Sequence, residues 1–259
     1  MASPASPSTN WQRDLLYTHG NIARAFGAQD AAEYFTRLLR IDEHFCHLSF
    51  AHNGPETFFV TWPTVPSAHP SVLIANRPAW LLDYLVRNYG TVVPQGIWSP
   101  ANPADAQRYN NVPLNMPIFF VHNDRRSLGL PVTSANAGNC MGLLNAHATA
   151  PVGECHTTYI RIKWPGYPEW STQIMTRDQT SLHRTITLEK LAKRVASAVC
   201  KFVESYAHLQ CQFPDWRVGG PGGIRSDDII LIGFIHVSQG SWQPILQINR
   251  YIMSGFPNV

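Results

Sequence analysis

Two segments of the chain, residues 31–45 and 187–209, place apolar side chains at every third or fourth position. This spacing keeps one face apolar over several turns, so both segments are predicted to be amphipathic helices. Asp30 and the Glu three positions later resemble a capping box, and a shorter helix is predicted before them, ending near Gly27. Residues 78–90 are predicted to form another helix, because they open with proline and close with glycine.

Strand patterns are clearest in the C-terminal half of the chain. Residues 229–237 are almost continuously apolar, which predicts a nearly fully buried central strand. Residues 238–242 then turn the chain, and residues 245–252 are predicted to return as its antiparallel hairpin partner. Residues 158–164 alternate apolar and polar side chains, as a half-buried strand does. Shorter apolar runs predict three more strands, at residues 57–61, 71–75 and 118–121.

The order of these elements determines the expected fold class. Strands and helices do not alternate regularly, which favours an α+β fold over a doubly wound one. We expect a single domain with a mixed or antiparallel sheet, a C-terminal β-hairpin and flanking helices. Residues 1–10 are rich in Ser and Pro and are predicted to be a disordered tail, with residues 11–259 forming the one globular domain.

Composition narrows the function classes and the compartment. The net charge is only +3 and charged residues make up 14% of the chain, so bulk electrostatics do not predict nucleic-acid binding. No run of about 18 apolar residues is present, so no membrane partner is expected, and the N-terminus lacks the pattern of a signal peptide. Five scattered cysteines are typical of free thiols in a reducing compartment, which predicts a cytoplasmic protein.

Tryptophan is the strongest compositional signal, with eight residues in the chain. Trp98, Trp170 and Trp242 lie close to proline or glycine, at the expected ends of elements. Loop tryptophans provide flat stacking surfaces for a ligand, although the same rings can close the ends of a sheet. We therefore expect a protein that binds an unidentified small molecule or protein partner through Trp- and Pro-rich loops.

The alternative to a binding protein is a hydrolase or transferase that uses a cysteine nucleophile. The sequence therefore leaves open whether the chain is an enzyme. The sequence Gly138-Asn-Cys-Met-Gly142 matches the cysteine form of a nucleophile elbow, so Cys140 is the candidate nucleophile. The general base would be His236 or His183, and the orienting carboxylate would be Asp228 or Asp178.

Three further places carry the residue types that bind a metal, a phosphate or an acidic partner. Cys140, His147, Cys155 and His156 have the chemistry of zinc ligands, but their spacing fits no zinc module, so neither a metal nor a cofactor is predicted. The glycine-rich segment 218–228 suits either a phosphate loop or a surface loop, but it leads into a strand. The last place is a stripe on the long helix that suits phosphates, an acidic partner or simply a solvated face. It is formed by Lys190, Arg194, Lys201 and His208.

Several stretches together resemble a family of hypothetical proteins found in mushroom-forming fungi. The resemblance spans most of residues 55–250, and it implies an intracellular, fungal, single-domain protein. It assigns no catalytic residue, cofactor or ligand. The stretches that carry it are residues 58–63, 75–83, 96–100, 158–167, 173–180 and 236–244.

Overall fold

The fold is α+β, as predicted, with a mixed sheet, a C-terminal hairpin and flanking helices. Of the predicted tail, residues 1–9 lie outside the described residues, and Asn10 begins the first helix. The predicted order of long elements in the C-terminal half is also confirmed. The computed structural model describes residues 10–39, 47–51, 57–61, 72–74, 77–86, 90–124 and 127–252.

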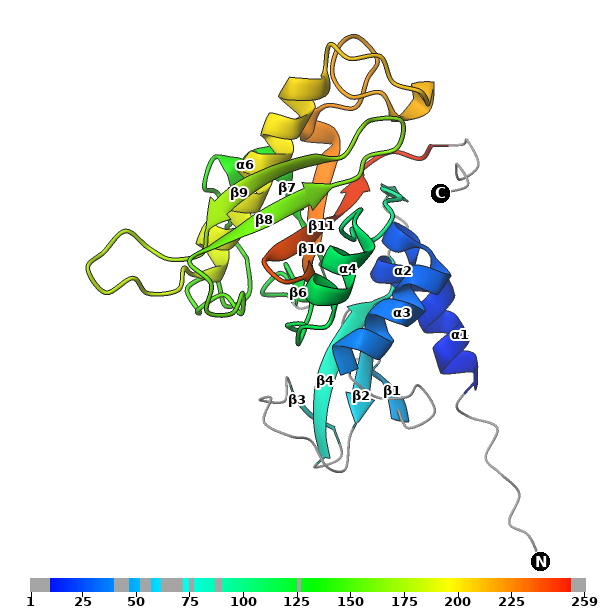
Figure 1. Cartoon of the computed structure of the whole chain (residues 1–259), viewed down its shortest axis with the longest axis vertical. Helices are drawn as coiled ribbons and strands as arrows, with labels where there is room; N and C mark the ends of the chain where they lie inside the picture. Colours follow the sequence, from blue (N-terminus) through cyan, green and yellow to red (C-terminus); the bar gives the residue numbers. More distant parts are fainter. Residues whose placement is uncertain are drawn as a thin grey trace, which may run out of the picture.

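The larger sheet is built around the C-terminal hairpin of β10 and β11 (Figure 1). Its main path runs β6-β10-β11-β8-β9, while β5 also pairs with β11 and β7 with β10. All of these pairs are antiparallel except β11 with β8, which makes the sheet mixed. The strands are β5 (Thr91–Val92), β6 (Ile118–Phe119), β7 (Leu130–Pro131), β8 (Thr157–Ile162), β9 (Trp170–Met175), β10 (Ile229–Ser238) and β11 (Ser241–Ile248).

Helices cover both faces of this sheet. On one face the core contains β8 and much of β10 and β11, packed against α6 (Leu188–Tyr206) and α5 (Val132–Asn136). On the other face, α1 (Asn10–His19), α2 (Asn21–Phe26) and α3 (Ala28–Leu39) pack against different residues of the same hairpin. This two-sided cover explains why β10 is apolar at nearly every position.

A β-bulge assigns the residues of β10 to these two faces. Before it, Leu231 packs towards α6 and Ile232 towards the N-terminal helices. The register then shifts between Leu231 and Gly233, and after the shift Phe234 lies on the α6 side and Ile235 on the other. One extra residue reverses which alternate positions face each side. Glycine fits here because a Cβ at Gly233 would lie 2.8 Å from the carbonyl oxygen of Ile118.

The prediction of a helix over residues 78–90 is wrong. The segment forms β4 (Arg77–Tyr84), which pairs antiparallel with β2 on one side and β3 on the other. Its leucines are compatible with either structure, and pairing with β2 and β3 decides for the strand. The second sheet has the order β1-β2-β4-β3, in which the other strands are β1 (His47–Ala51), β2 (Thr57–Thr61) and β3 (Val72–Ile74).

The predicted helix over residues 31–45 starts earlier than expected. Gly27 has φ of 89° and separates α2 from α3, which then begins at Ala28. Asp30 lies inside α3 rather than capping it, and its carboxylate accepts a hydrogen bond from the N–H of Ile97 at 3.0 Å. Residues 40–45 of the prediction lie outside the described residues.

Three short helices complete the described parts of the chain. Asn102 caps α4 by accepting a hydrogen bond from the N–H of Ala104 at 3.0 Å. Within the described ranges, no helix has both the length and the apolar character needed to cross a membrane. The short helices are α4 (Pro103–Asn110), η2 (Pro214–Trp216) and η3 (Ser226–Asp228).

Candidate functional site

The three tryptophans proposed as a stacking surface do not form one. Trp242 is 1% exposed and stacks on the rings of Phe234 and His236, at centroid distances of 5.0 and 4.8 Å. The Trp242 ring therefore offers no exposed face on which a ligand could stack, which removes the support for the prediction that it binds one. The residue instead fills the core between β10 and β11.

Trp98 and Trp170 are half-buried, and each already has a partner. The guanidinium of Arg161 lies 4.2 Å from the centroid of the Trp98 ring, the geometry of a cation–π contact. Trp170 begins β9 and packs edge-on against Phe202 of α6, with centroids 6.1 Å apart. Both rings therefore help to attach loops and edges to the core, the alternative role considered for them.

Cys140, His236 and Asp228 do not form a triad. The Cys140 side chain is buried, and its Sγ lies 3.9 Å from the carbonyl oxygen of Glu189. His236 Nδ1 accepts a hydrogen bond from the N–H of Asn115 at 2.9 Å, while Asp228 accepts one from the N–H of Arg225. Each member thus has partners of its own, and none of these bonds joins two members of the triad.

The electrostatics also oppose nucleophilic chemistry at Cys140. Burial raises the pKa of its thiol, and the nearby carboxylate of Glu189 raises it further, against the opposing charge of Lys193. A raised pKa lowers the fraction of thiolate, which is the reactive form. Burial also lowers the pKa of His236, to about 4, so this imidazole is neutral near pH 7.

The described residues do not bring the zinc set together, and the glycine-rich loop is bonded internally. Among the described residues, no three His, Cys, Asp or Glu side chains are placed to hold a metal ion. The loop that begins at Val218 closes on itself, because the N–H of Gly219 donates to the carbonyl of Ile224 and that of Gly223 to Gly220. These N–H groups are therefore not directed at a phosphate.

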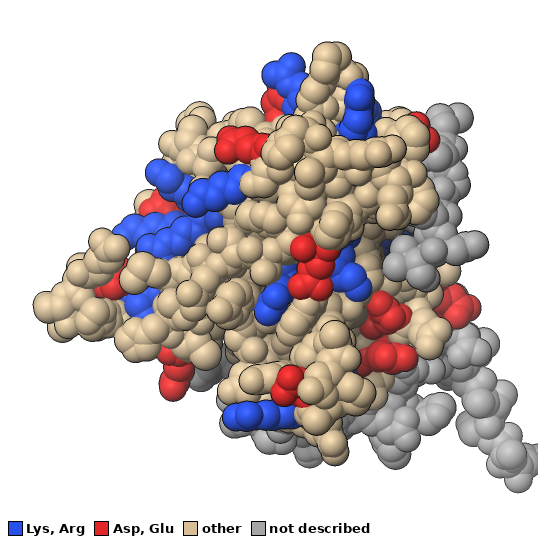
Figure 2. Space-filling view, turned by 45° about the horizontal axis from the view of Figure 1, so that its top comes forward, with Lys and Arg blue, Asp and Glu red and all other residues tan. Residues whose placement is uncertain are grey.

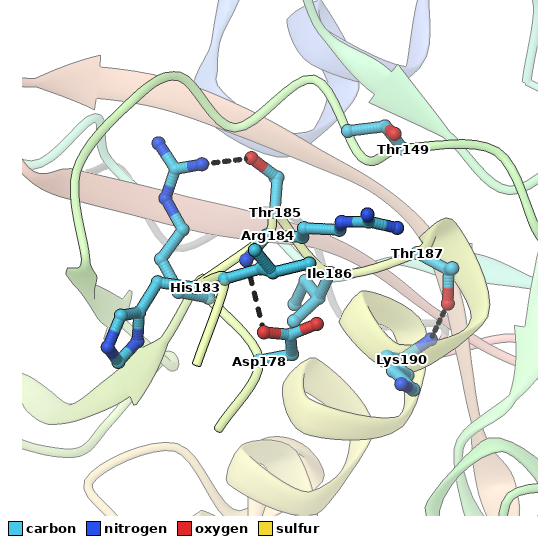
Figure 3. Close-up of a pocket in the computed structure, with 10 residues that line it drawn as sticks. Thr149, Asp178, His183, Arg184, Thr185, Ile186, Thr187 and Lys190 are labelled. Atoms are coloured by element: carbon cyan, nitrogen blue, oxygen red, sulfur yellow. Dashed lines mark hydrogen bonds between the residues drawn. The ribbon is translucent and has the colours of Figure 1, made fainter. Parts of the chain in front are cut away.

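A pocket of about 570 Å³ lies where the segment between β9 and α6 folds back against the start of α6 (Figure 3). Backbone pairing of Arg177 with Thr185, and an N–H bond from Asp178 to the carbonyl of Arg184, make this segment a small hairpin. Thr149 pairs with Thr187 and closes another side. The lining residues are Thr149, Arg177, Asp178, Leu182, His183, Arg184, Thr185, Ile186, Thr187 and Lys190.

The pocket is basic, since three Arg or Lys side chains line it against one carboxylate. That carboxylate, Asp178, is held by its own hairpin and accepts hydrogen bonds from the Thr180 hydroxyl at 2.7 Å and the Arg184 N–H at 3.0 Å. The Thr180 bond is the main cause that keeps the pKa of Asp178 below its usual value, with the charge of Lys190 contributing. Figure 2 shows Lys and Arg gathered on the side where this hairpin projects.

The cations of the pocket differ in how they are engaged. Arg177 is structural, because its guanidinium donates to the Thr185 hydroxyl at 2.5 Å and to the carbonyl of Glu154 at 2.8 Å. Arg184 extends towards Thr149 and Thr187 (Figure 3). Within the part of the chain that the structure describes, its guanidinium has no hydrogen bond or ion pair. The Lys190 ammonium has none there either, and it acts on Asp178 only through its charge.

The backbone at the start of α6 adds no free donors. The N–H groups of Leu188 and Glu189 donate to the carbonyls of Ala148 and Ala146, at 2.9 and 3.0 Å. The Lys190 N–H is 3.4 Å from the hydroxyl of Thr187, the N-cap residue. An anion in the pocket would therefore be held by side chains rather than by the end of the helix.

Sequence patterns predict only part of this pocket. Lys190 belongs to the basic stripe of the long helix, whereas Arg184 and the threonines belong to none of the predicted motifs. The signal that could have found them is local, because Arg177, Arg184 and Lys190 are the cations of one short stretch around a turn. No family model, curated protein or solved structure matches this chain, so the geometry of the pocket is the basis for its function.

Proposed function

We propose that this protein binds a small phosphorylated ligand non-covalently in the pocket between the β9–α6 hairpin and the start of α6. The observation that carries the proposal is a pair of cations, Arg184 and Lys190, whose side chains have no hydrogen-bond or ion-pair partner among the described residues, in a pocket whose one carboxylate is already bonded within its own hairpin. Such a pair leaves a net positive charge that an anionic ligand neutralises.

Phosphate suits these groups better than a single carboxylate does. An arginine offers a planar pair of donors to two phosphate oxygens, and a lysine adds a point charge. The hydroxyls of Thr149 and Thr185 line the same pocket and provide neutral donors for the remaining oxygens. The volume of about 570 Å³ lies within the range typical of small-molecule pockets, roughly 300–1,000 Å³.

This proposal keeps the expected class, a binding protein, and moves its site from the tryptophans to the basic pocket. Catalysis by Cys140 has less support, because its thiol is buried, lacks a histidine partner in the described structure and has a raised pKa. We also propose a cytoplasmic location, supported by the free thiols of Cys140, Cys155, Cys200 and Cys211.

Calorimetric titration with defined probes tests the site. The probes are inorganic phosphate, pyrophosphate, a hexose phosphate and ATP, each added to the full chain at low and at physiological salt. At least one probe should bind, and replacing both cations (Arg184→Gln with Lys190→Gln) should weaken that binding about 10- to 100-fold, since two charge-assisted hydrogen bonds are lost.

Lys201→Gln is the matched control, because Lys201 is an exposed cation on the same helix, outside the pocket. This variant should bind the probe as tightly as the parent chain does. Equal weakening by Lys201→Gln would show that the anion responds only to total charge. That result, unchanged binding by the double variant, or no binding of any probe would each overturn the proposed function.

A further inference from the structure

Asp178, the one carboxylate that lines the basic pocket, uses its two oxygens differently. Oδ1 accepts three hydrogen bonds from within the hairpin, from the Thr180 hydroxyl at 2.7 Å, the Arg184 N–H at 3.0 Å and the Thr180 N–H at 3.3 Å. In the described structure, all hydrogen bonds of this side chain end on Oδ1. Oδ2 is therefore not needed to hold the turn of the hairpin.

The hairpin also fixes the position of this carboxylate. Backbone hydrogen bonds run from the Asp178 N–H to the carbonyl of Arg184 at 2.8 Å and from the His183 N–H to the carbonyl of Thr180 at 3.1 Å. Together with the bonds to Oδ1, they leave the Asp178 side chain little freedom to rotate. The acceptor is in place before a ligand arrives, so less conformational freedom is lost on binding.

Oδ2 faces the pocket rather than the hairpin. Figure 3 shows this second oxygen of Asp178 on the side of Lys190, away from the oxygen that bonds the Arg184 N–H. The hydrogen bond from the Thr180 hydroxyl is the main cause that holds the pKa of Asp178 below its usual value, so the carboxylate is ionised near pH 7. The pocket therefore presents a negatively charged acceptor beside its cations.

A phosphate ion alone does not match this arrangement. Near pH 7 it offers mainly acceptor oxygens that carry negative charge, as Oδ2 does, so the two repel each other where they meet. A ligand fits better when, besides a phosphate for Arg184 and Lys190, it brings a hydrogen-bond donor to Asp178. The pocket of about 570 Å³ is much larger than a phosphate ion and has room for that further part.

The charge of the pocket selects the kind of donor. An ammonium group or a divalent cation beside Asp178 would also lie near three cations of the pocket lining, which repel it. Among the described residues, no three His, Cys, Asp or Glu side chains are placed to hold a metal ion. A hydroxyl group is neutral, and it donates a charge-assisted hydrogen bond to a carboxylate.

We propose, on the basis of the proposed function, that the ligand is a phosphate ester of a sugar or another polyol. Arg184 and Lys190 hold its phosphate, and Asp178 Oδ2 accepts a hydrogen bond from one of its hydroxyls. Leu182 lines the same pocket and is 65% exposed, so it offers an apolar contact to the C–H groups of the ligand. Asp178 is thus the residue that selects hydroxylated esters over simple ones.

Calorimetric titration of the full chain with esters of equal phosphate charge tests this selection. The probes are glucose 6-phosphate, glycerol 3-phosphate, ethyl phosphate and phosphoethanolamine. At least one of the two polyol phosphates should bind about 10-fold more tightly than ethyl phosphate, because only the polyols donate to Asp178. Phosphoethanolamine should bind no more tightly than ethyl phosphate, since its ammonium meets the cations of the pocket.

Asp178→Asn removes the acceptor but keeps the turn, because the Asn carbonyl oxygen can replace Oδ1 while the amide nitrogen replaces Oδ2. The preference for the polyol phosphate should fall to about 3-fold or less, and ethyl phosphate should bind equally or more tightly. Asp178→Ser is the second variant, since its hydroxyl can still accept from the turn. Asp215→Asn is the matched control, because it removes the same charge from an exposed position of η2, outside the pocket, and should keep the preference.

The outcomes separate this inference from the proposed function. Equal binding of all four esters, tightest binding of phosphoethanolamine, or a preference that survives in both Asp178 variants would overturn the inference while Arg184 and Lys190 still bind phosphate. A preference that appears only with added Mg²⁺ would overturn it as well, since the carboxylate would then act through a metal ion. No binding of any ester would overturn both proposals.

Discussion

Asp83 is a carboxyl group buried between β4 and the start of α2. It is 0% exposed, and its two oxygens accept hydrogen bonds from the N–H groups of Tyr84 at 2.7 Å and Ile22 at 2.9 Å. Burial raises its pKa to about 8, although these backbone bonds act in the opposite direction. The fit is tight, because a Cβ at Gly20 would lie 2.5 Å from Asp83 Oδ2.

This raised pKa predicts a loss of stability with rising pH. The folded chain holds the Asp83 proton more tightly than the unfolded chain, whose Asp has a pKa of about 3.9. The stabilisation is complete below pH 4 and is lost as the pH rises towards 8. Between pH 6 and pH 8 we expect urea unfolding to show a decrease of about 2 kcal/mol from this group.

Asp83→Asn provides the comparison, because it keeps the shape of the side chain and cannot titrate. Between pH 6 and pH 8 its unfolding free energy should fall by about 2 kcal/mol less than that of the parent chain, whatever the absolute stability of the variant. The folded pKa of His236, about 4, lies below its unfolded value, so this group gains stability as the pH rises through 6.5; the gain is the same in both chains and cancels in their difference. Parallel pH profiles for the parent and Asp83→Asn would show that the carboxyl is ionised throughout.

At the scale of elements, β10 and β4 show when an apolar pattern is sufficient to predict whether a segment forms a strand or a helix. The run from Ile229 to Val237 is too continuous for an amphipathic helix, and the structure confirms a central strand. The leucines of β4 also fit a helix, and only their pairing with β2 and β3 excludes it. Short apolar segments thus remain ambiguous until their non-local partners are known.

Ile232→Asp tests how strictly β10 is buried. Ile232 is 2% exposed in the cluster formed with the N-terminal helices. A carboxylate placed there has no partner of opposite charge and should lower the unfolding free energy by more than about 4 kcal/mol, or prevent soluble expression. Chemical denaturation measures the loss.

Ser171→Asp is the control, since it puts the same charge on an exposed position of β9, the last strand on the main path of the larger sheet. We expect its stability to stay within about 0.5 kcal/mol of the parent chain. A soluble Ile232→Asp chain with parent-like stability would contradict the burial of this strand.

At the scale of the molecule, two hydrophobic clusters share one hairpin. Both contain residues of β10 and β11, one cluster together with α6 and the other together with the N-terminal helices. Neither cluster can lose its packing without exposing the other face of the same strands. We therefore predict that residues 11–259 unfold as the single domain expected from the sequence, with one calorimetric transition whose enthalpy equals the van't Hoff value.

The same scan with and without dithiothreitol examines the redox state of the cysteines. The four described cysteines are free, so reductant should leave the transition temperature unchanged. Two separate transitions would show that the clusters unfold independently. A temperature that falls by several degrees in reductant would reveal a stabilising disulfide and contradict the proposed compartment.

The sequence by itself determined the elements whose apolar pattern is long and unambiguous, α6 and the β10–β11 hairpin, and with them the α+β class. Local periodicity suffices there, because burial along a whole face is written into consecutive residues. Tertiary structure decided the candidate sites, because folding determines which of their side chains meet and which are kept apart. The pocket needs Thr149 beside Thr187 to close one of its sides, and the proposed triad fails because folding gives its members different partners.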